Sequence, residues 1–139
     1  MFFEKCRVLL VEDDADTREM VAFGLHSEGF EVMAIGNARL ARRIAREQHF
    51  DAYLLDNWLP DGTGLELCRQ IRKFDRATPL VFYSGSAELS DEQEALDAGA
   101  QAYVHKPAGI DEVIDAINDV VTVAGNKERR TPTGSLLGL

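Results

Sequence analysis

Cysteine is scarce in this sequence, and long apolar runs are absent from it. The two cysteines among 139 residues, Cys6 and Cys68, are far apart and outside any Cys-x-x-Cys pattern. This spacing indicates neither a disulfide framework nor a zinc site, and it favours the reducing cytoplasm. No stretch approaches the roughly 18 uninterrupted apolar residues of a membrane-spanning helix, and the first residues lack the apolar core and cleavage site of a signal peptide. We therefore expect a cytoplasmic protein that makes no contact with a membrane.

Positive charge is also in short supply. The chain has 15 Lys and Arg residues against 24 Asp and Glu residues, so its formal net charge is −9. Such a charge keeps a protein in solution and disfavours general attraction to nucleic acid, so we expect no direct nucleic-acid binding by this chain. The hydrophobic content of 45% is ordinary for a globular protein, and 139 residues suit one domain.

The end of the chain differs in composition from the rest. From about residue 122 the sequence TVAGNKERRTPTGSLLGL loses its periodic pattern and gains glycine, threonine and charge. Such a change is typical of a linker or a frayed tail. We therefore predict one domain over residues 1–124, followed by a C-terminal tail or linker stump over residues 125–139.

Five short apolar runs alternate with five segments of helical periodicity. The runs have the length and composition of strands, and they cover Arg7–Val11, Glu31–Ile35, Ala52–Leu55, Pro79–Tyr83 and Ala102–His105. The helical segments cover approximately Asp16–Ser27, Ala38–Gln48, Gly64–Phe74, Asp91–Ala98 and Ile110–Val123. Strict alternation of strand and helix predicts a parallel sheet with helices on both faces, because each crossover must return the chain to the same end of the sheet. The predicted fold class is therefore α/β, a doubly wound three-layer α/β/α domain.

Local signals agree with these boundaries. Three residue pairs match the capping box of a helix N-terminus, namely Asp16 with Glu19, Thr63 with Glu66 and Ser90 with Gln93. Gly29 and Gly99 suit the C-termini of the helices that precede them, since glycine readily adopts the left-handed conformation found there.

Polar side chains follow the strands at the edge where ligands bind in doubly wound folds. Glu12 and Asp13 follow the first strand, Asp56 the third, Ser84 the fourth, and Lys106 the fifth. Three carboxylates held close together repel one another unless a cation compensates, and a hard divalent ion with oxygen ligands does so naturally. We therefore predict a Mg²⁺ site.

A magnesium ion beside a nucleophilic aspartate suits phosphoryl transfer. Asp56 would form an acyl phosphate, while the ammonium of Lys106 and the hydroxyl of Ser84 would face the charge that spreads over the phosphoryl oxygens. A permanent phosphate site, as in a flavin mononucleotide carrier, would instead favour glycine-rich backbone at a helix N-terminus. The acidic turn at Glu12 and Asp13 argues against that alternative.

These residues resemble the receiver domain of response regulators. The resemblance covers approximately residues 6–124 and rests on four motifs in the family's order, which are VLLVEDD at 8–14, LLDNWLPDGTG at 54–64, SGS at 84–86 and YVHKP at 103–107. It implies a flavodoxin-like five-stranded sheet of order 2-1-3-4-5. It also implies that Asp56 accepts a phosphoryl group from a sensor histidine kinase or phosphotransfer protein. The magnesium ligands would be Glu12, Asp13, Asp56 and the backbone carbonyl of Trp58.

The resemblance also assigns a switch. Ser84 and Tyr103 would move together toward the phosphoryl group, whose oxygens Lys106 would bind. Pro60 and Gly64 would shape the loop after Asp56, and the peptide before Pro107 would be cis, an arrangement open mainly to proline. The expected partners are the kinase and a downstream effector protein or domain, bound at the surface of the fourth helix, fifth strand and fifth helix. A phosphorylation-dependent homodimer is a further possibility.

Some features depart from the family pattern or remain outside it. Ala108 and Gly109 stand where the family often has a bulky apolar residue, and Trp58 is large for its position. The last helix carries acids without any Lys or Arg before Lys127. The second helix has a basic stripe, which consists of Arg39, Arg42, Arg43 and Arg46. Two interpretations of the stripe stay open: a face exposed to solvent, or a docking surface for an acidic partner. We treat the three histidines as structural; they are His26, His49 and His105.

The predicted protein is a signalling domain and not an enzyme, apart from its own phosphorylation and dephosphorylation. Two alternatives stay open. One is a receiver fold that works as an interaction module without phosphorylation, against which the intact acids and Lys106 argue. The other is a haloacid-dehalogenase-type phosphatase, which requires a second acid where Trp58 stands.

Overall fold

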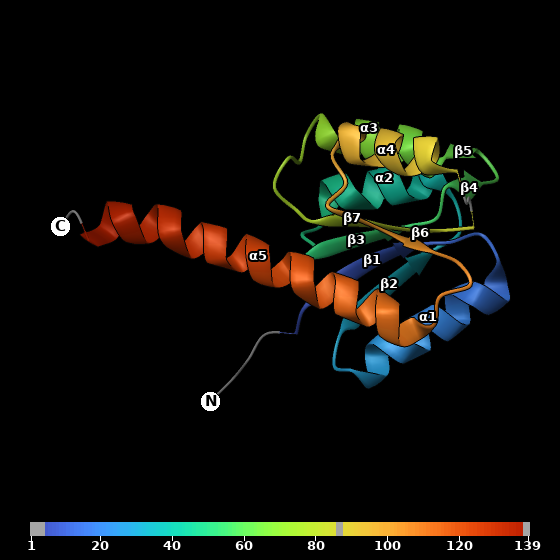
Figure 1. Ribbon diagram of the computed structural model, residues 1–139, viewed down its shortest axis with the longest axis horizontal. Helices are drawn as coiled ribbons and strands as arrows, with labels where there is room; N and C mark the ends of the chain where they lie inside the picture. The colour runs from blue at the N-terminus through green and yellow to red at the C-terminus, as the bar shows by residue number, and fades with distance from the viewer. Residues whose placement is uncertain (1–4, 86–87, 138–139) are drawn as a thin grey trace.

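The computed structural model describes residues 5–85 and 88–137, with side chains up to residue 125. Ser86 of the Ser-Gly-Ser motif lies outside this description. The described residues form a five-stranded parallel sheet with helices on both faces (Figure 1). The sheet consists of β1 (Arg7–Val11), β2 (Glu31–Ile35), β3 (Ala52–Leu55), β6 (Leu80–Ser84) and β7 (Ala102–His105).

The strand order is β2-β1-β3-β6-β7. It confirms the predicted order 2-1-3-4-5, because two very short strands, β4 (Trp58–Leu59) and β5 (Gly62–Thr63), form a separate antiparallel hairpin. The hairpin was not predicted, since two-residue strands leave no periodic pattern in the sequence. It lies in the loop that follows Asp56.

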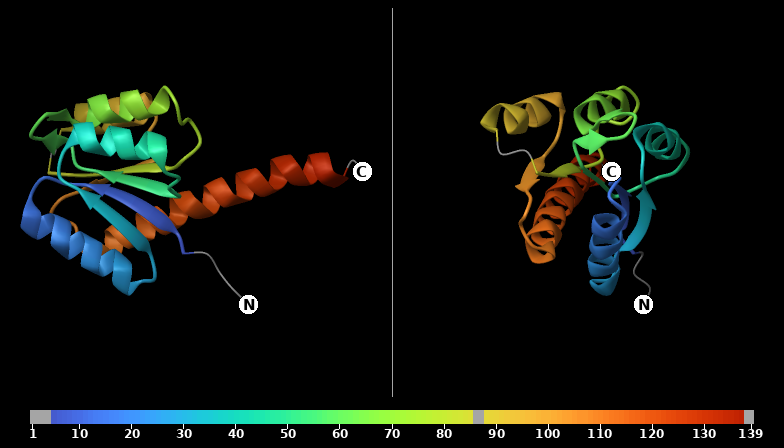
Figure 2. Two further views of the ribbon diagram at one scale, coloured as in Figure 1. Left: turned by 180° about the vertical axis from the view of Figure 1, so that it is seen from behind. Right: turned by 90° about the vertical axis from the view of Figure 1, so that its right-hand side faces the viewer.

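The helices form the two outer layers, which confirms the three-layer α/β/α architecture. α1 (Ala15–Ser27) and α5 (Ile110–Leu137) cover one face of the sheet, and α2 (Ala38–Glu47), α3 (Gly64–Arg72) and α4 (Leu89–Ala98) cover the other (Figures 1 and 2).

Side chains along the central strands alternate between two apolar cores, one on each face of the sheet. On β1, Val8 and Leu10 pack on the side of α1 and α5, whereas Leu9 and Val11 pack on the side of α2, α3 and α4. The alternation follows from the two-residue period of a strand. Because both faces are covered, the central strands are apolar throughout, as buried parallel strands usually are.

The helix termini correct two of the predicted caps. Asp14, and not Asp16, is the N-cap of α1, where its carboxylate accepts a hydrogen bond from Thr17 N at 2.9 Å. α1 begins at Ala15, one residue earlier than predicted, because the side chain of Asp14 already satisfies the free N–H of Thr17. The predicted pair of Ser90 and Gln93 is also wrong, since α4 begins at Leu89 and Ser90 already lies within it.

The remaining predicted caps are confirmed. Thr63 Oγ1 accepts a hydrogen bond from Glu66 N at 3.1 Å and caps α3. Gly29 and Gly99 follow α1 and α4 with φ angles of 94° and 116°, in the left-handed region that glycine adopts at little cost.

α5 is longer than predicted and projects past the sheet (Figure 1). The expectation that it ends near Val123 and gives way to an irregular tail was wrong. Residues 127–130 are Lys, Glu and Arg, which favour helix, and the prediction gave more weight to Gly125. None of the helices in the described part of the chain combines the length and apolar character needed to cross a membrane.

Candidate functional site

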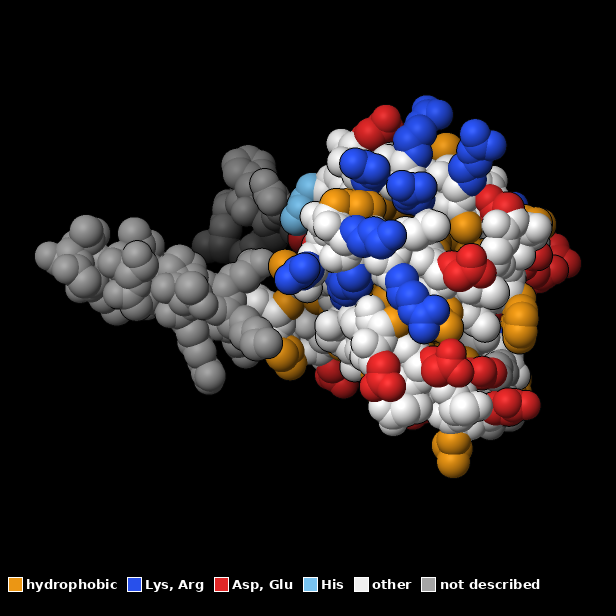
Figure 3. Space-filling model, turned by 90° about the horizontal axis from the view of Figure 1, so that it is seen from above, with side chains coloured by type: hydrophobic (Ala, Val, Ile, Leu, Met, Phe, Trp, Pro, Cys, Tyr) orange, Lys and Arg blue, Asp and Glu red, His pale blue; other side chains and the backbone are white. Residues whose placement is uncertain are grey.

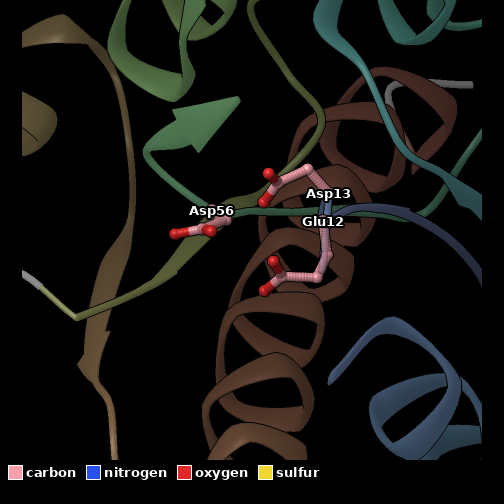
Figure 4. A group of neighbouring side chains, drawn as sticks. All are labelled: Glu12, Asp13 and Asp56. Carbon is pink, nitrogen blue, oxygen red and sulfur yellow. The ribbon is translucent and has the colours of Figure 1, made fainter. Parts of the chain in front are cut away.

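Three carboxylates meet at the carboxyl ends of two neighbouring strands. Val11 of β1 pairs with Leu55 of β3 in parallel register, so the residues that follow them come side by side. As a result, Glu12, Asp13 and Asp56 each offer an oxygen atom within 4.8 Å of the others (Figure 4). The structure thus brings together the three acids that the sequence analysis proposed as metal ligands.

The three acids differ in burial. Glu12 and Asp56 are 2% and 6% exposed, whereas Asp13 is exposed to solvent. Burial raises the pKa of Glu12 above its ordinary value, and the nearby negative charge of Asp56 acts in the same direction. The hydrogen bond from Lys106 opposes this rise without cancelling it. The cluster therefore holds more negative charge than its surroundings favour.

Lys106 supplies positive charge to this cluster from the end of β7. Its Nζ atom donates a hydrogen bond to Glu12 Oε1 at 2.7 Å and lies 3.4 Å from Asp56 Oδ2. Burial alone would lower the pKa of Lys106, but the hydrogen bond to Glu12 and the negative charge of Asp56 raise it above its ordinary value. The ammonium group is therefore charged at neutral pH.

The loop after Asp56 is tightly constrained by its backbone. Asn57 N donates a hydrogen bond to Asp56 Oδ1 at 2.8 Å, and Asn57 Oδ1 accepts one from Leu65 N at 3.1 Å. A Cβ atom added to Gly64 would lie 2.2 Å from the carbonyl oxygen of Asp56. No side chain fits at such a distance, so this position requires glycine. Trp58, in the same loop, is 59% exposed.

Two further side chains fix the loops around the site, and neither was predicted from the sequence. Asp61 accepts hydrogen bonds from Ala38 N at 2.8 Å and Arg39 N at 2.9 Å, which ties the loop after Asp56 to the N-terminus of α2. Arg18 Nη1 donates to the carbonyl oxygen of Glu12 at 2.8 Å. Asp61 lies in a Pro-Asp-Gly turn, where an acid is ordinary, so nothing in the sequence marked its distant partner.

Ser84 and Tyr103 lie on the neighbouring strands β6 and β7. Ser84 is the last residue of β6, beside the site, whereas Tyr103 lies two residues before the end of β7 and so farther from the site. Ser84 is fully buried at the end of β6, and its Oγ atom has no hydrogen-bond partner in the part of the chain that the structure describes. The ring of Tyr103 is stacked on Phe82, with 5.7 Å between ring centroids and 11° between planes. The peptide between Lys106 and Pro107 is cis, as predicted.

His105 has a more specific contact than the structural role expected of it. Its Nε2 atom lies 2.6 Å from Glu92 Oε1, so the end of β7 is joined to α4. Its ring centroid lies 4.9 Å from that of Tyr103. A lone histidine in an apolar run gave no signal of this pairing.

The donor set suits a divalent cation. Carboxylate oxygens from Glu12, Asp13 and Asp56 are the hard ligands that Mg²⁺ prefers, and the exposure of Asp13 leaves room for the waters that this ion retains. Burial of Glu12 and the nearby charge of Asp56 both oppose ionisation of the Glu12 carboxyl, and a bound cation would offset them. The residues present therefore fit a magnesium ion.

Taken together, a doubly wound sheet and an acidic cluster at its carboxyl edge define a flavodoxin-like domain with a candidate metal site. More particularly, the family model of the response regulator receiver domain matches residues 8–118. The chain belongs to this family.

Curated relatives include regulators of transcription. The chain is 33% identical over 132 residues to the cell cycle transcriptional regulator CtrA of Caulobacter vibrioides, covering 94% of this chain and 57% of CtrA. It is 37% identical over 101 residues to the DNA-binding response regulator MtrA of Mycobacterium leprae, covering 73% of this chain and 44% of MtrA. The chain thus spans about half the length of the curated relatives it matches.

Solved structures agree with this assignment. A CheY-like response regulator receiver domain from Methanospirillum hungatei aligns with a TM-score of 0.86 and 27% identity, covering 89% of this chain and 99% of that one. The non-phosphorylated HemR receiver domain from Leptospira biflexa aligns with a TM-score of 0.79 and 29% identity, covering 84% and 94%.

Family membership decides between the functions that the sequence left open. The chain is a receiver domain of two-component response regulators, a family that generally signals through phosphorylation of an aspartate and does not catalyse metabolic reactions. Neither the phosphatase nor the unphosphorylated interaction module is favoured.

Proposed function

We propose that Asp56 is the residue that accepts the phosphoryl group, and that its donor is a sensor histidine kinase or a phosphotransfer protein. The observation that carries this proposal is the convergence of three carboxylates with the ammonium of Lys106 at one edge of the sheet. Asp56 offers an oxygen within 4.8 Å of both other acids, and its Oδ2 atom lies 3.4 Å from Lys106 Nζ.

The surroundings of Asp56 support its role as a nucleophile. The hydrogen bond from Asn57 N to Oδ1 orients the carboxylate, and Oδ2 lies on the side of Lys106. Glu12, Asp13 and Asp56, with the carbonyl oxygen of Trp58, would hold Mg²⁺, which when bound neutralises charge on the phosphoryl oxygens. Lys106 would bind the same oxygens from its own side. The only chemistry we assign to the domain is this self-phosphorylation and its reversal.

Ser84 and Tyr103 are the proposed switch. The Oγ atom of Ser84 is buried without a partner among the described residues, so a phosphoryl oxygen at Asp56 would give it a hydrogen bond that it lacks. A bound phosphoryl group would thereby favour one of two conformations. Movement of Ser84 would change the space open to the ring of Tyr103. Pro60, Gly64 and Pro107 would hold the surrounding loops in shape.

The proposed arrangement of the chain is a receiver domain over residues 1–124 and a linking segment or tail over residues 125–139. Phosphorylation would alter the affinity of the surface formed by α4, β7 and α5 for an effector protein or domain, or for a second phosphorylated copy. The relatives' names associate them with transcription or DNA. With its net charge of −9, this chain would leave DNA contact to such an effector. We place the protein in the cytoplasm, where its two free cysteines stay reduced.

Intact-mass analysis tests the proposal. Incubation with acetyl phosphate and Mg²⁺ should add the mass of one phosphoryl group, and Asp56→Asn should abolish the gain. Asp51→Asn, at the opposite end of β3, is the matched control and should retain it. An unchanged mass with acetyl phosphate and also with an active histidine kinase would show that the domain works without phosphorylation.

Metal binding can be measured separately. Trp58 is the only tryptophan and lies two residues after Asp56, so its fluorescence should report on Mg²⁺. Asp13→Ala should weaken saturable Mg²⁺ binding about tenfold or more, since losing even a residue that only supports a metal ligand typically costs about tenfold. Asp16→Ala, a nearby exposed acid outside the cluster, should leave the affinity unchanged. Equal affinities for the wild type and Asp13→Ala would remove Asp13 from the site.

A further inference from the structure

A basic face on α2 lies outside the phosphorylation chemistry. We call it the arginine face, and it consists of Arg39, Arg42, Arg43 and Arg46, all exposed. Residues three and four apart share one side of a helix, so the four guanidinium groups lie together. With Leu40 they line an open hollow of about 500 Å³. Figure 3 looks onto the layer of α2, α3 and α4 and shows Lys and Arg gathered over it, with Asp and Glu mostly toward its edges.

The arginine face is poorly neutralised within the molecule. Among the described residues, its one ion pair joins Arg43 Nε to Glu47 at 3.7 Å, and both side chains are largely exposed. The guanidinium of Arg46 lies over the ring of Phe74, 5.3 Å from its centroid. Exposed pairs of this kind are weak, so the face keeps most of its positive charge although the protein is acidic overall.

A second feature of opposite charge lies on α5. We call it the acid stripe, and it consists of Asp111, Glu112, Asp115 and Asp119, all exposed. The sequence has no Lys or Arg between residues 107 and 126. Arg76 lines the same hollow as Asp119, but no ion pair to the four acids occurs among the described residues. Val123, one turn beyond Asp119, is 60% exposed beside a hollow of about 400 Å³.

We propose that the arginine face of one copy of this protein binds the acid stripe of a second copy. Four positive groups spread over eight residues match four negative groups spread over nine, and each set covers about 10–12 Å along its helix. Each surface also carries an exposed apolar residue, Leu40 or Val123, that the contact would cover. Two arginine faces cannot pair with each other, because their like charges would repel.

The positions of the two surfaces define the assembly. α2 and α5 lie on opposite faces of the sheet (Figure 1), so the contact joins different surfaces of the two copies and leaves one of each free. Such head-to-tail contacts produce rings or open chains and not closed pairs.

The net charge of −9 opposes association in general. At about 0.15 M salt, however, charges more than about 8 Å apart are largely screened, so the facing helices dominate. The inference goes beyond the proposed phosphorylation and does not depend on it.

A charge exchange tests the contact. Sedimentation velocity of the unphosphorylated full chain at about 0.15 M salt should show an average mass that rises with protein concentration and returns to that of a monomer near 1 M salt, where screening is nearly complete. Arg42→Glu with Arg46→Glu should abolish the rise, and so should Asp115→Arg with Asp119→Arg. A mixture of the two variants should restore it, because each then carries the complement of the other.

Matched controls separate this contact from a change in net charge or in folding. Arg42→Glu alone should already weaken the association, whereas Lys5→Glu, which shifts the net charge by the same amount at an exposed site outside both surfaces, should leave it intact. Recovery in the mixture would itself show that both variants fold. A monomer at every concentration, association that survives either reversal, or a mixture that stays monomeric would overturn the proposal. Binding of a DNA duplex through Arg42 and Arg46 by a monomeric protein would overturn it too.

Discussion

Lys106 Nζ lies 2.7 Å from Glu12 Oε1 and 3.4 Å from Asp56 Oδ2, so one ammonium group serves two carboxylates from different strands. Both carboxylates are buried, and each would otherwise face the charge of the other. Lys106 therefore neutralises the site when no metal is bound, and it also repels a metal that approaches. Lys106 should therefore weaken metal binding and, at the same time, speed phosphorylation.

Replacing Lys106 by the uncharged Met tests this opposition. We expect Lys106→Met to bind Mg²⁺ about three- to tenfold more tightly, an electrostatic effect of about 1 kcal/mol. Phosphorylation by acetyl phosphate should nevertheless become slower, because the phosphoryl oxygens lose a counter-charge. Trp58 fluorescence and the rate of mass gain are the two measurements. Lys5→Met should change neither quantity, and faster phosphorylation of Lys106→Met would contradict the assignment.

Gly64 allows the loop after Asp56 to fold back on the site. Because an added Cβ would lie 2.2 Å from the carbonyl oxygen of Asp56, Gly64→Ala should displace that backbone and lower the free energy of unfolding by about 1–3 kcal/mol. Phosphorylation should also slow. Gly109 is the control, since nothing lies within 4 Å of its added Cβ, and Gly109→Ala should change stability by less than about 0.5 kcal/mol. Urea denaturation would compare the two, and equal stabilities would refute the close contact.

The sheet could be predicted from the sequence because buried parallel strands are continuous apolar runs between polar boundaries. The run at Ala52–Leu55 coincides with β3 for this reason. β6 starts at Leu80, one residue later than predicted, because Pro79 has no N–H to give to a ladder. The convergence of Glu12 and Asp56 followed from the same pattern, since neighbouring parallel strands end at one edge.

Contacts that depend on the path of a loop could not be predicted. Asp61 reaches the N-terminus of α2 only because the hairpin of β4 and β5 turns it that way. His105 meets Glu92 through the packing of α4 on the sheet. The composition of the C-terminus gave a wrong prediction, because Gly125 was given more weight than the helix-favouring residues after it.

Removing the hydroxyl of Ser84 should not destabilise the protein, although most substitutions of buried residues do. The hydroxyl of Ser84 is buried without a hydrogen-bond partner among the described residues, which is unfavourable, so Ser84→Ala should leave the free energy of unfolding unchanged or raise it by up to about 1 kcal/mol. Thr63 is a contrasting control, because Thr63→Ala removes a helix cap and should cost about 1 kcal/mol. Chemical denaturation of the unphosphorylated protein measures both. A clear loss of stability in Ser84→Ala would mean that its hydroxyl has a partner in the native state.

Asp75 should make stability depend on pH at the end of the sheet opposite the site. Its Oδ2 atom accepts a hydrogen bond from the hydroxyl of Tyr53 at 2.7 Å, and its Oδ1 atom accepts from Ala77 N and Thr78 N at 3.1 and 3.0 Å. Burial raises the pKa of Asp75, but these hydrogen bonds outweigh it and hold the pKa below its ordinary 3.8. The folded protein therefore favours the ionised carboxylate more than the unfolded chain does.

A carboxyl group whose pKa is lowered by folding stabilises the protein above its unfolded pKa, and this stabilisation is lost as the pH falls through the folded pKa. Near neutral pH, Asp75→Asn should lower the free energy of unfolding by about 1 kcal/mol, the value of one hydrogen bond. The difference from the wild type should shrink below about pH 4 as the native carboxylate takes up its proton. Urea denaturation across this pH range measures the difference, and a gap that stays constant with pH would show that the charge of Asp75 contributes nothing.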